Sequence, residues 1–86
     1  MNFVFTREQI QYSPRYRDNQ YEYRHLILAY STAEEKDAVH KLAAMQRHLS
    51  EGEWRQLGLE MSIGRQHYGF HKPEPNVMLF KCPIID

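Results

Sequence analysis

Four short stretches of the chain have the pattern of strands. Residues 8–12 alternate weakly between hydrophobic and polar side chains, and 21–28 is an aromatic and β-branched run. A third stretch covers 65–71, and an apolar run at 76–81 ends before Pro83. Successive strand residues point to opposite faces, so the odd-numbered residues of the second stretch would share one face and the even-numbered residues the other. We therefore expect four strands.

The spacing changes between the second and third strands, where hydrophobic residues recur at helical intervals. Ser31 and Glu34 have the form of a capping box, with Ser31 as N-cap, and predict a helix near residues 32–48. A second capping box begins at Ser50 and predicts a short helix over about residues 51–57. The order of strands, then helices, then strands favours an α+β fold over a parallel α/β sheet.

The segment between the last two strands contains two prolines, Pro73 and Pro75. Neither can donate a ladder hydrogen bond, and each holds the residue before it in an extended conformation. Such a stiff hinge suits two outcomes. The last strand can fold back beside the third, or it can complete the sheet of another copy of the chain.

The bulk properties indicate one soluble domain, residues 1–86. The formal net charge is zero, which argues against nucleic acid as the main partner. No apolar run reaches the roughly 20 residues of a membrane span, and no signal peptide is evident, so no membrane partner is expected. Cys82 is the one cysteine, which excludes an internal disulfide and favours a reducing compartment, the nucleus and cytoplasm.

Residue types that carry chemistry are present but are not arranged in a catalytic motif. His67 and His71 would share a strand face yet lie about 13 Å apart, so we expect no metal site. A lone cysteine such as Cys82 is more often an apolar filler than a nucleophile. A small enzyme that uses Cys82 or His67 stays a rival hypothesis, although no phosphate loop or catalytic triad accompanies them. We predict no catalytic residue and no cofactor.

Tyrosines cluster in the first quarter of the chain, at positions 12, 16, 21 and 23. Tyrosine is enriched at protein interfaces because it joins an apolar ring to a polar tip. The same residues could instead pack on the sheet, and the pattern alone leaves both readings open.

Three blocks of sequence resemble the Cks family, the accessory subunits of cyclin-dependent kinases. They occur in the family's order and spacing, and the His-x-Pro-Glu-Pro motif is highly specific. The blocks are Tyr12–Tyr16 with Tyr21–His25, Ser50–Gly58, and Ser62–Tyr68 with His71–Pro75. The resemblance implies a four-stranded antiparallel sheet with two helices inserted between strands two and three. The hinge, residues 71–75, would permit dimers by exchange of the last strand.

The resemblance also implies a non-enzymatic adaptor that works in cell-cycle control. Such a protein binds the catalytic subunit of a cyclin-dependent kinase. Through a separate pocket it docks phosphorylated threonine in a Thr-Pro context, on proteins that are already phosphorylated.

The family's phosphate pocket carries over to Arg15, Arg24 and Ser62, with two departures. Arg65 stands where the family usually has tryptophan, and Cys82 where it usually has arginine. We hypothesise that Arg65 replaces both missing groups. The rival reading is a weakened pocket, because one lost charge-assisted hydrogen bond costs about 1.5–3 kcal/mol. In that case the protein is a partner-binding adaptor with a lost or altered phosphate pocket.

The family's kinase contacts carry over to Tyr16, Tyr68, His71 and Glu74. Two neighbouring positions depart: Gly69 replaces a larger apolar residue, and Lys72 reverses the charge of the common glutamate. The helix near 32–48 is longer than the usual family connection and could present a surface of its own.

Overall fold

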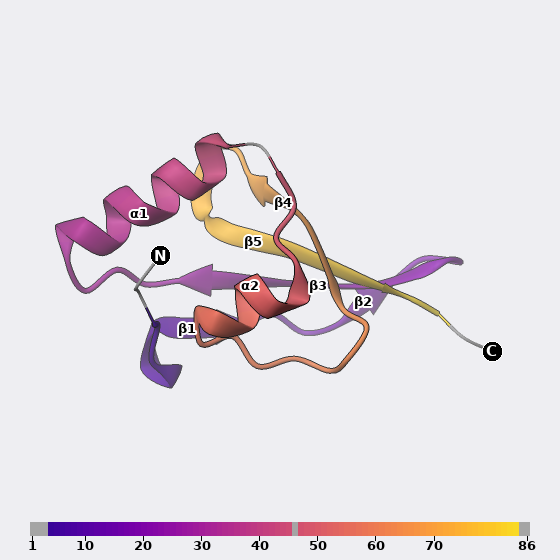
Figure 1. Cartoon of the computed structure of the whole chain (residues 1–86). Coiled ribbons are helices and arrows are strands. Elements are labelled where there is room, and N and C mark those ends of the chain that lie inside the picture. The colour runs from indigo at the N-terminus through magenta and orange to yellow at the C-terminus, as the bar shows by residue number, and fades with distance from the viewer. Residues whose placement is uncertain (1–3, 46, 85–86) are drawn as a thin grey trace.

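The computed structural model describes residues 4–45 and 47–84. Within these residues, five antiparallel strands and two α-helices form one α+β unit (Figure 1). No helix in this part of the chain is long and apolar enough to cross a membrane. The elements are a 3-10 turn (Arg7–Gln9), β1 (Ile10–Tyr12), β2 (Tyr16–Arg17), β3 (Tyr21–Leu28), α1 (Ala33–Ala44), α2 (Glu51–Gln56), β4 (Gln66–His71) and β5 (Glu74–Pro83).

The sheet has the strand order β1-β3-β5-β4, and β2 also pairs with β3. Both β1 and β2 are antiparallel to β3, with Ile10 opposite Leu28 and Tyr16 opposite Tyr23. They therefore act as one edge strand that is interrupted where Pro14 cannot donate a ladder hydrogen bond. This agrees with the predicted fold, to which the structure adds the short strand β2.

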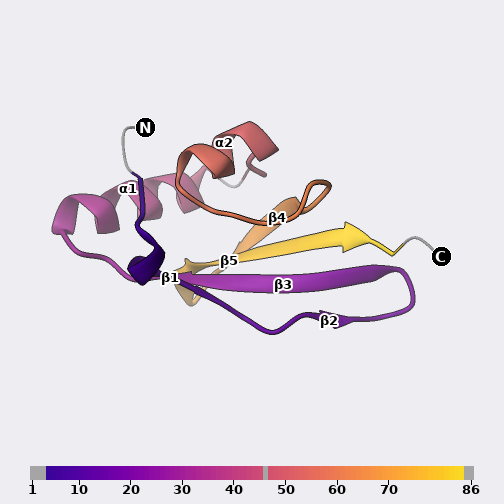
Figure 2. The ribbon, with the colours of Figure 1, turned by 90° about the horizontal axis from the view of Figure 1, so that it is seen from below.

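Both helices lie on the same side of the sheet (Figure 2). The predicted alternation of β3 is confirmed on this side, because Leu26 and Leu28 are buried. Trp54 of α2 packs edge-on against Phe80 of β5, with ring centroids 5.5 Å apart. Burying each such side chain stabilises the fold by about 1.5–3 kcal/mol. We call this side the covered face and the other side the open face.

The start of α1 differs from the prediction by one residue. Thr32, not Ser31, is the N-cap, and Glu35, not Glu34, completes the capping box. The reason is tertiary: Glu35 Oε1 accepts hydrogen bonds from Ser31 N at 2.6 Å and from Gln9 Nε2 at 3.1 Å. This carboxylate ties the helix to the 3-10 turn that precedes β1, which the local sequence could not reveal.

The end of α1 also differs, since the helix stops at Ala44 rather than near residue 48. Position 46 of the predicted range lies outside the described residues. Beyond it, Leu49 N donates to Nδ1 of the buried His67 at 2.9 Å. This bond holds Leu49 against β4, and a continued helix would not bring the backbone of Leu49 to His67. The second helix is as predicted, with Ser50 as its N-cap.

The first predicted strand is shorter than expected, because residues 7–9 form a 3-10 turn. The side chain of Gln9 explains the change. Its Nε2 donates to Ala29 O at 3.0 Å and to Ser31 Oγ at 2.9 Å, so it turns toward the start of α1. The predicted third strand is confirmed from Gln66 onward, and the fourth is longer than predicted.

The hinge folds back on itself in this structure. β4 and β5 form a hairpin in which His71 pairs with Glu74, so the turn consists of Lys72 and Pro73. Pro75 lies inside β5, and Pro83 is its last residue. Of the two outcomes left open by the sequence, the single chain shows the first, and strand exchange between copies stays a prediction.

Candidate functional site

The open face carries a groove of about 360 Å³ formed by residues of β2, β3, β5 and the hinge. Three of the four predicted kinase contacts, Tyr16, His71 and Glu74, line it. Sequence reasoning did not assign its other members, although all lie on the alternate face of β3 or β5. We call this surface the aromatic groove: Tyr16, His25, Ile27, His71, Glu74, Val77 and Leu79.

The fourth predicted contact, Tyr68, joins the aromatic groove through Tyr23. Tyr23 stacks on Tyr16 with ring centroids 5.6 Å apart, and Tyr68 meets Tyr23 edge-on at 6.1 Å. Of the two readings of the tyrosine cluster, packing is what the structure shows, because the rings lie on the sheet and against one another, and a role at an interface stays a prediction. Tyr16 nevertheless stays 48% exposed, so its ring remains available to a partner.

A hydrogen bond fixes the centre of this row of rings. The hydroxyl of Tyr23 donates to Asp18 Oδ2 at 2.7 Å. Since this bond favours the neutral phenol, it raises the pKa of Tyr23 to about 12. The carboxyl of Asp18 also accepts from Gln20 N and Tyr21 N, at 2.8 Å each. The turn between β2 and β3 thus holds the ring in place.

The predicted phosphate residues lie on or beside the covered face, at the end of the sheet opposite the hinge. We call Arg15, Arg24, Ser62 and Arg65 the basic cluster. Arg24 Nε donates to Ser13 O at 3.1 Å, and its guanidinium lies 4.8 Å from the centre of the Tyr12 ring. Tyr12 Oη in turn accepts from Glu60 N at 2.9 Å. These contacts place Arg24 and Glu60 around the same tyrosine, and Ser62 follows Glu60 by two residues in the loop from α2 to β4.

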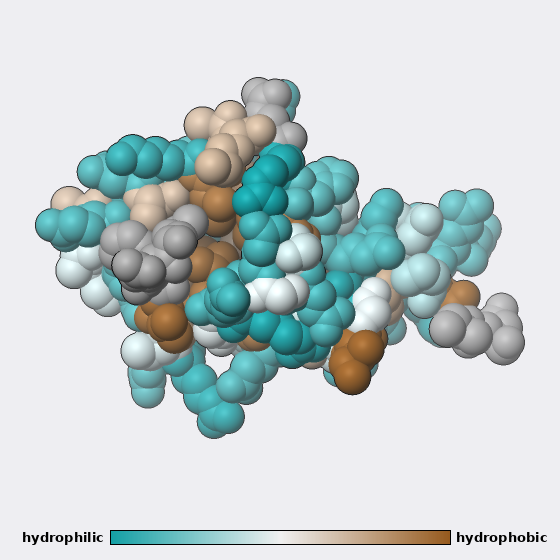
Figure 3. Space-filling model, viewed as in Figure 1, coloured by the Kyte–Doolittle hydropathy of each residue, from teal (hydrophilic) through white to brown (hydrophobic). Residues whose placement is uncertain are grey.

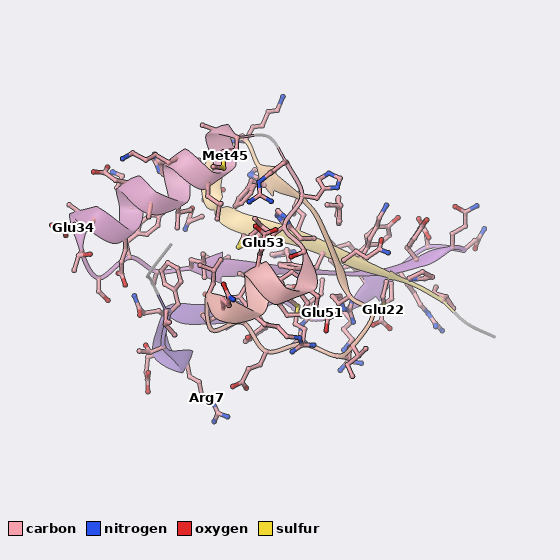
Figure 4. The ribbon with its side chains drawn as sticks, viewed as in Figure 1. Arg7, Glu22, Glu34, Met45, Glu51 and Glu53 are labelled. Atoms are coloured by element: carbon pink, nitrogen blue, oxygen red, sulfur yellow. The ribbon has the colours of Figure 1, made fainter. Side chains whose placement is uncertain are left out.

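Arg65 does not lie open to solvent as Arg15 and Ser62 do. Only 2% of its side chain is exposed, and its Nη2 donates to Glu22 Oε1 at 2.8 Å. Its Nη1 also donates to the Glu22 backbone oxygen at 3.3 Å. Figure 4 shows Glu22 at this end of the sheet, beside the loop from α2 to β4. Arg65 is therefore already engaged within the protein.

Glu22 is the member of this site that sequence reasoning missed. The hydrogen bond from Arg65 is the main reason why its pKa is lowered, and the charges of Arg65, Arg15 and Arg17 add to the effect. The signal was present in the sequence, since Glu22 lies two residues before Arg24 and so shares its strand face. The site thus contains an acid as well as its arginines.

Cys82 lies between the two members of this ion pair. It pairs with Glu22 across β3 and β5, and Arg65 directly precedes Gln66, which pairs with Lys81. The register therefore sets Glu22 and Cys82 side by side, with Arg65, the residue just before β4, next to them at the same end of the sheet. Because β3 and β4 are about 10 Å apart with β5 between them, Arg65 must reach over Cys82.

A smaller hollow of about 190 Å³ lies between α1 and α2, and Figure 3 shows apolar surface there. Its apolar lining is formed by Leu42, Met45, Leu49 and Leu57, and Arg47 and Glu53 pair at its rim. None of these residues was predicted to bind a partner. Across residues 4–45 and 47–84, no three side chains of the metal-ligating types come together as a metal site would require.

The fold is a small α+β module built on one antiparallel sheet, with a candidate binding surface on each face. A family profile described as "Cyclin-dependent kinase regulatory subunit" matches residues 10–84. The chain therefore belongs to the family of cyclin-dependent kinase regulatory subunits. Members of this family are regulatory subunits, so the chain is a regulatory adaptor and not an enzyme, and the hypothesis of catalysis by Cys82 or His67 is dropped.

Individual relatives support the same assignment. The chain is 46% identical to "Cyclin-dependent kinases regulatory subunit 2" of Arabidopsis thaliana, over 88% of this chain and 83% of the relative. It is 47% identical to a probable regulatory subunit of Physarum polycephalum, over 91% of this chain and 84% of the relative. The Saccharomyces cerevisiae regulatory subunit is 43% identical over 90% of this chain, which spans 53% of that longer protein.

Proposed function

We propose that this protein binds the catalytic subunit of a cyclin-dependent kinase through its aromatic groove and docks phosphothreonine-proline sites at its basic cluster. It would thereby bring phosphorylated cell-cycle proteins to the kinase, in the nucleus and cytoplasm. The single observation that carries the proposal is the placement of the two surfaces. Tyr23 and Arg24 are neighbours in β3 and point to opposite faces of the sheet, so two partners can bind at once.

The aromatic groove has the features of a protein-binding surface. Its rings are rigid and hold apolar area at the surface, which is the composition of interface hot spots. Val77 and Leu79 add aliphatic side chains from β5. At the hinge end, His71 Nδ1 lies 3.9 Å from Glu74 Oε1, and both side chains remain substantially exposed. They can therefore also contact polar groups of a kinase.

The basic cluster has the features of a phosphate site. Guanidinium groups match the geometry of phosphate oxygens, and a hydroxyl adds a further donor. Arg24 is half-buried and held by Ser13 and Tyr12, so it is pre-oriented, whereas Arg15 and Ser62 are exposed and free to close on a ligand. Arg15, Arg24 and Ser62 would therefore make the first contacts with a phosphate group.

Isothermal titration with a phosphothreonine-proline peptide tests this function, with the unphosphorylated peptide as a control. We expect selective binding of the phosphorylated form and a loss of at least about tenfold in Arg24→Ala, since one charge-assisted hydrogen bond is worth about 1.5–3 kcal/mol. Lys36→Ala removes the same charge from the exposed face of α1 and should bind as the wild type does. Equal binding of both peptides would contradict the proposal.

A second candidate is an adaptor that binds its kinase without reading phosphate. The observation that favours it is the ion pair of Arg65 with Glu22, which leaves the basic cluster with fewer free cations than the family pocket. Kinase binding without any phosphate-dependent peptide binding at millimolar concentration would support this alternative.

The hinge at Pro73 and Pro75 would also permit homodimers in which two chains exchange β5. In the folded-back form, β5 pairs with both β3 and β4 of its own chain, and the same pairs would form between copies. Light scattering of the purified protein would reveal such dimers as a doubled mass.

A further inference from the structure

The positive charge of the basic cluster is partly neutralised by an acidic side chain of the same protein, Glu22. The Glu22 carboxylate lies in the field of Arg65, Arg15 and Arg17, with Arg65 in direct contact at 2.8 Å. An incoming phosphate carries negative charge and would seek the same guanidinium groups. The carboxylate and the phosphate therefore compete for the same cations.

The register of the sheet explains why this chain can make the internal contact. Arg65 spans from the start of β4 to β3, a distance of about two strand spacings. Cys82, which pairs with Glu22 on the strand between them, is a small residue and obstructs that path less than an arginine would. An arginine at position 82 would lie directly opposite Glu22 and fill the space. Tryptophan at position 65 would bring no charge to the carboxylate.

We propose that Glu22 is a built-in competitor for the phosphate, which holds Arg65 inside the protein and keeps the affinity of the basic cluster low. A phosphorylated ligand must displace the carboxylate before Arg65 can contribute to binding. This inference rests on the proposed phosphate-reading function and adds the residue that limits it. It also reconciles the two readings of Arg65, because the cation is present but is occupied until a ligand arrives.

The exchange is physically feasible. The Glu22 side chain is 25% exposed, so its carboxylate can turn into water when it is released. Arg65 Nε is buried with no hydrogen-bond partner among the described residues, so the ion pair leaves part of the guanidinium unsatisfied. A phosphate offers more charge and more acceptor oxygens than one carboxylate, and can satisfy more of these donors.

The test measures binding of a phosphothreonine-proline peptide to Glu22→Gln. Glutamine keeps the size of the side chain but removes its charge, and we expect the affinity to rise about three- to tenfold. Glu34→Gln is the matched control, because it makes the same change in net charge at the far end of α1 (Figure 4). It should leave the affinity unchanged.

Glu22→Gln could raise the affinity in two ways: it could release Arg65, or it could simply remove a negative charge that repels the phosphate. The variant Arg65→Met distinguishes these two explanations. If Glu22 acts by holding Arg65, the gain from Glu22→Gln should vanish in the Arg65→Met background. A gain that persists there, or no gain in Glu22→Gln alone, overturns the proposal. Thermal melting of each variant, with a cooperative transition as the criterion, shows that the affinities are those of folded proteins.

The outcomes also distinguish this inference from the function on which it rests. Equal phosphate-dependent binding by the wild type and Glu22→Gln would sink the inference and keep the function. Binding by Glu22→Gln but not by the wild type would keep the inference and show that the site is latent. Absence of binding by both, with folded proteins, would overturn both.

Discussion

The two faces of the sheet carry candidate binding surfaces of opposite character. The aromatic groove is built from rings and aliphatic side chains that pack on each other and still leave Tyr16 exposed. The basic cluster is built from charges, and its one buried arginine is paired with Glu22. Apolar groups that pack together keep their outer surface available to a partner. Opposite charges that meet satisfy each other, and a ligand must then compete with the protein itself.

The faces also differ in their histidines. His67 is buried on the covered face among the rings of Phe70 and Phe80, whereas His71 is exposed at the hinge. Burial lowers the pKa of His67 from its ordinary value of 6.5 to about 4. Its Nδ1 must stay unprotonated to accept the hydrogen bond from Leu49 N. The covered face therefore depends on a neutral imidazole.

The largest expected effect is a loss of folding stability on mild acidification. It would act on the covered face, where His67 is buried. Because the pKa of His67 is lower in the folded state, the unfolded state binds more protons below pH 6.5, so stability is complete above that pH and declines toward pH 4. We expect the free energy of unfolding to fall by about 2 kcal/mol between pH 7.5 and pH 5. Urea unfolding at both pH values measures it.

One variant sharpens this experiment. His67→Gln removes the titrating group and should flatten the pH dependence. The pKa of Glu53 is about 2, chiefly because Arg47 donates to it, so its contribution is lost only below 4.5 and lies outside the window. An equal loss of stability in His67→Gln and the wild type would refute the assignment.

The next effect concerns the aromatic groove. Removing the exposed ring in Tyr16→Ala should weaken binding to a cyclin-dependent kinase catalytic subunit roughly tenfold, because aromatic residues dominate interface energies. Phosphopeptide binding should not change, since that site lies on the other face. Surface plasmon resonance with the immobilised kinase measures the first, and titration the second. Met45→Ala, which trims an exposed apolar side chain at the end of α1, is the control.

A parallel loss of kinase and phosphopeptide binding in Tyr16→Ala would show that the two faces are not independent. The contrast between an aromatic binding surface on one face and a separate basic one on the other would then be wrong.

The smallest effect is spectroscopic and tests how firmly the rings are held. In Asp18→Asn, Tyr23 no longer donates to a carboxylate, so its pKa should fall from about 12 toward 10. Alkaline titration of the phenolate absorbance of both proteins would show one tyrosine ionising at lower pH in the variant. Asp37→Asn on α1 should titrate as the wild type does. Coincident curves for Asp18→Asn would mean that the bond does not hold the ring.

Much of the fold was predictable because its signals are local. The alternation of β3 predicted which of its residues share a face, and the capping box at Ser50 predicted the second helix. The shifts at the start and end of α1 were not predictable, because Glu35 and Leu49 are held by Gln9 and His67, far away in sequence. Short-range patterns do not record such partners.

The candidate sites also have some features that the sequence predicts and others that only the folded structure shows. The sequence by itself determined the family, the order of the elements, and the aromatic and basic residues available to each surface, because these follow from residue type and spacing. Only the tertiary structure decided that Arg65 reaches across Cys82 to Glu22, since that contact depends on which strands are neighbours and in what register. Strand register is set by the packing of the whole sheet, so the state of a charge within it is a property of the folded chain.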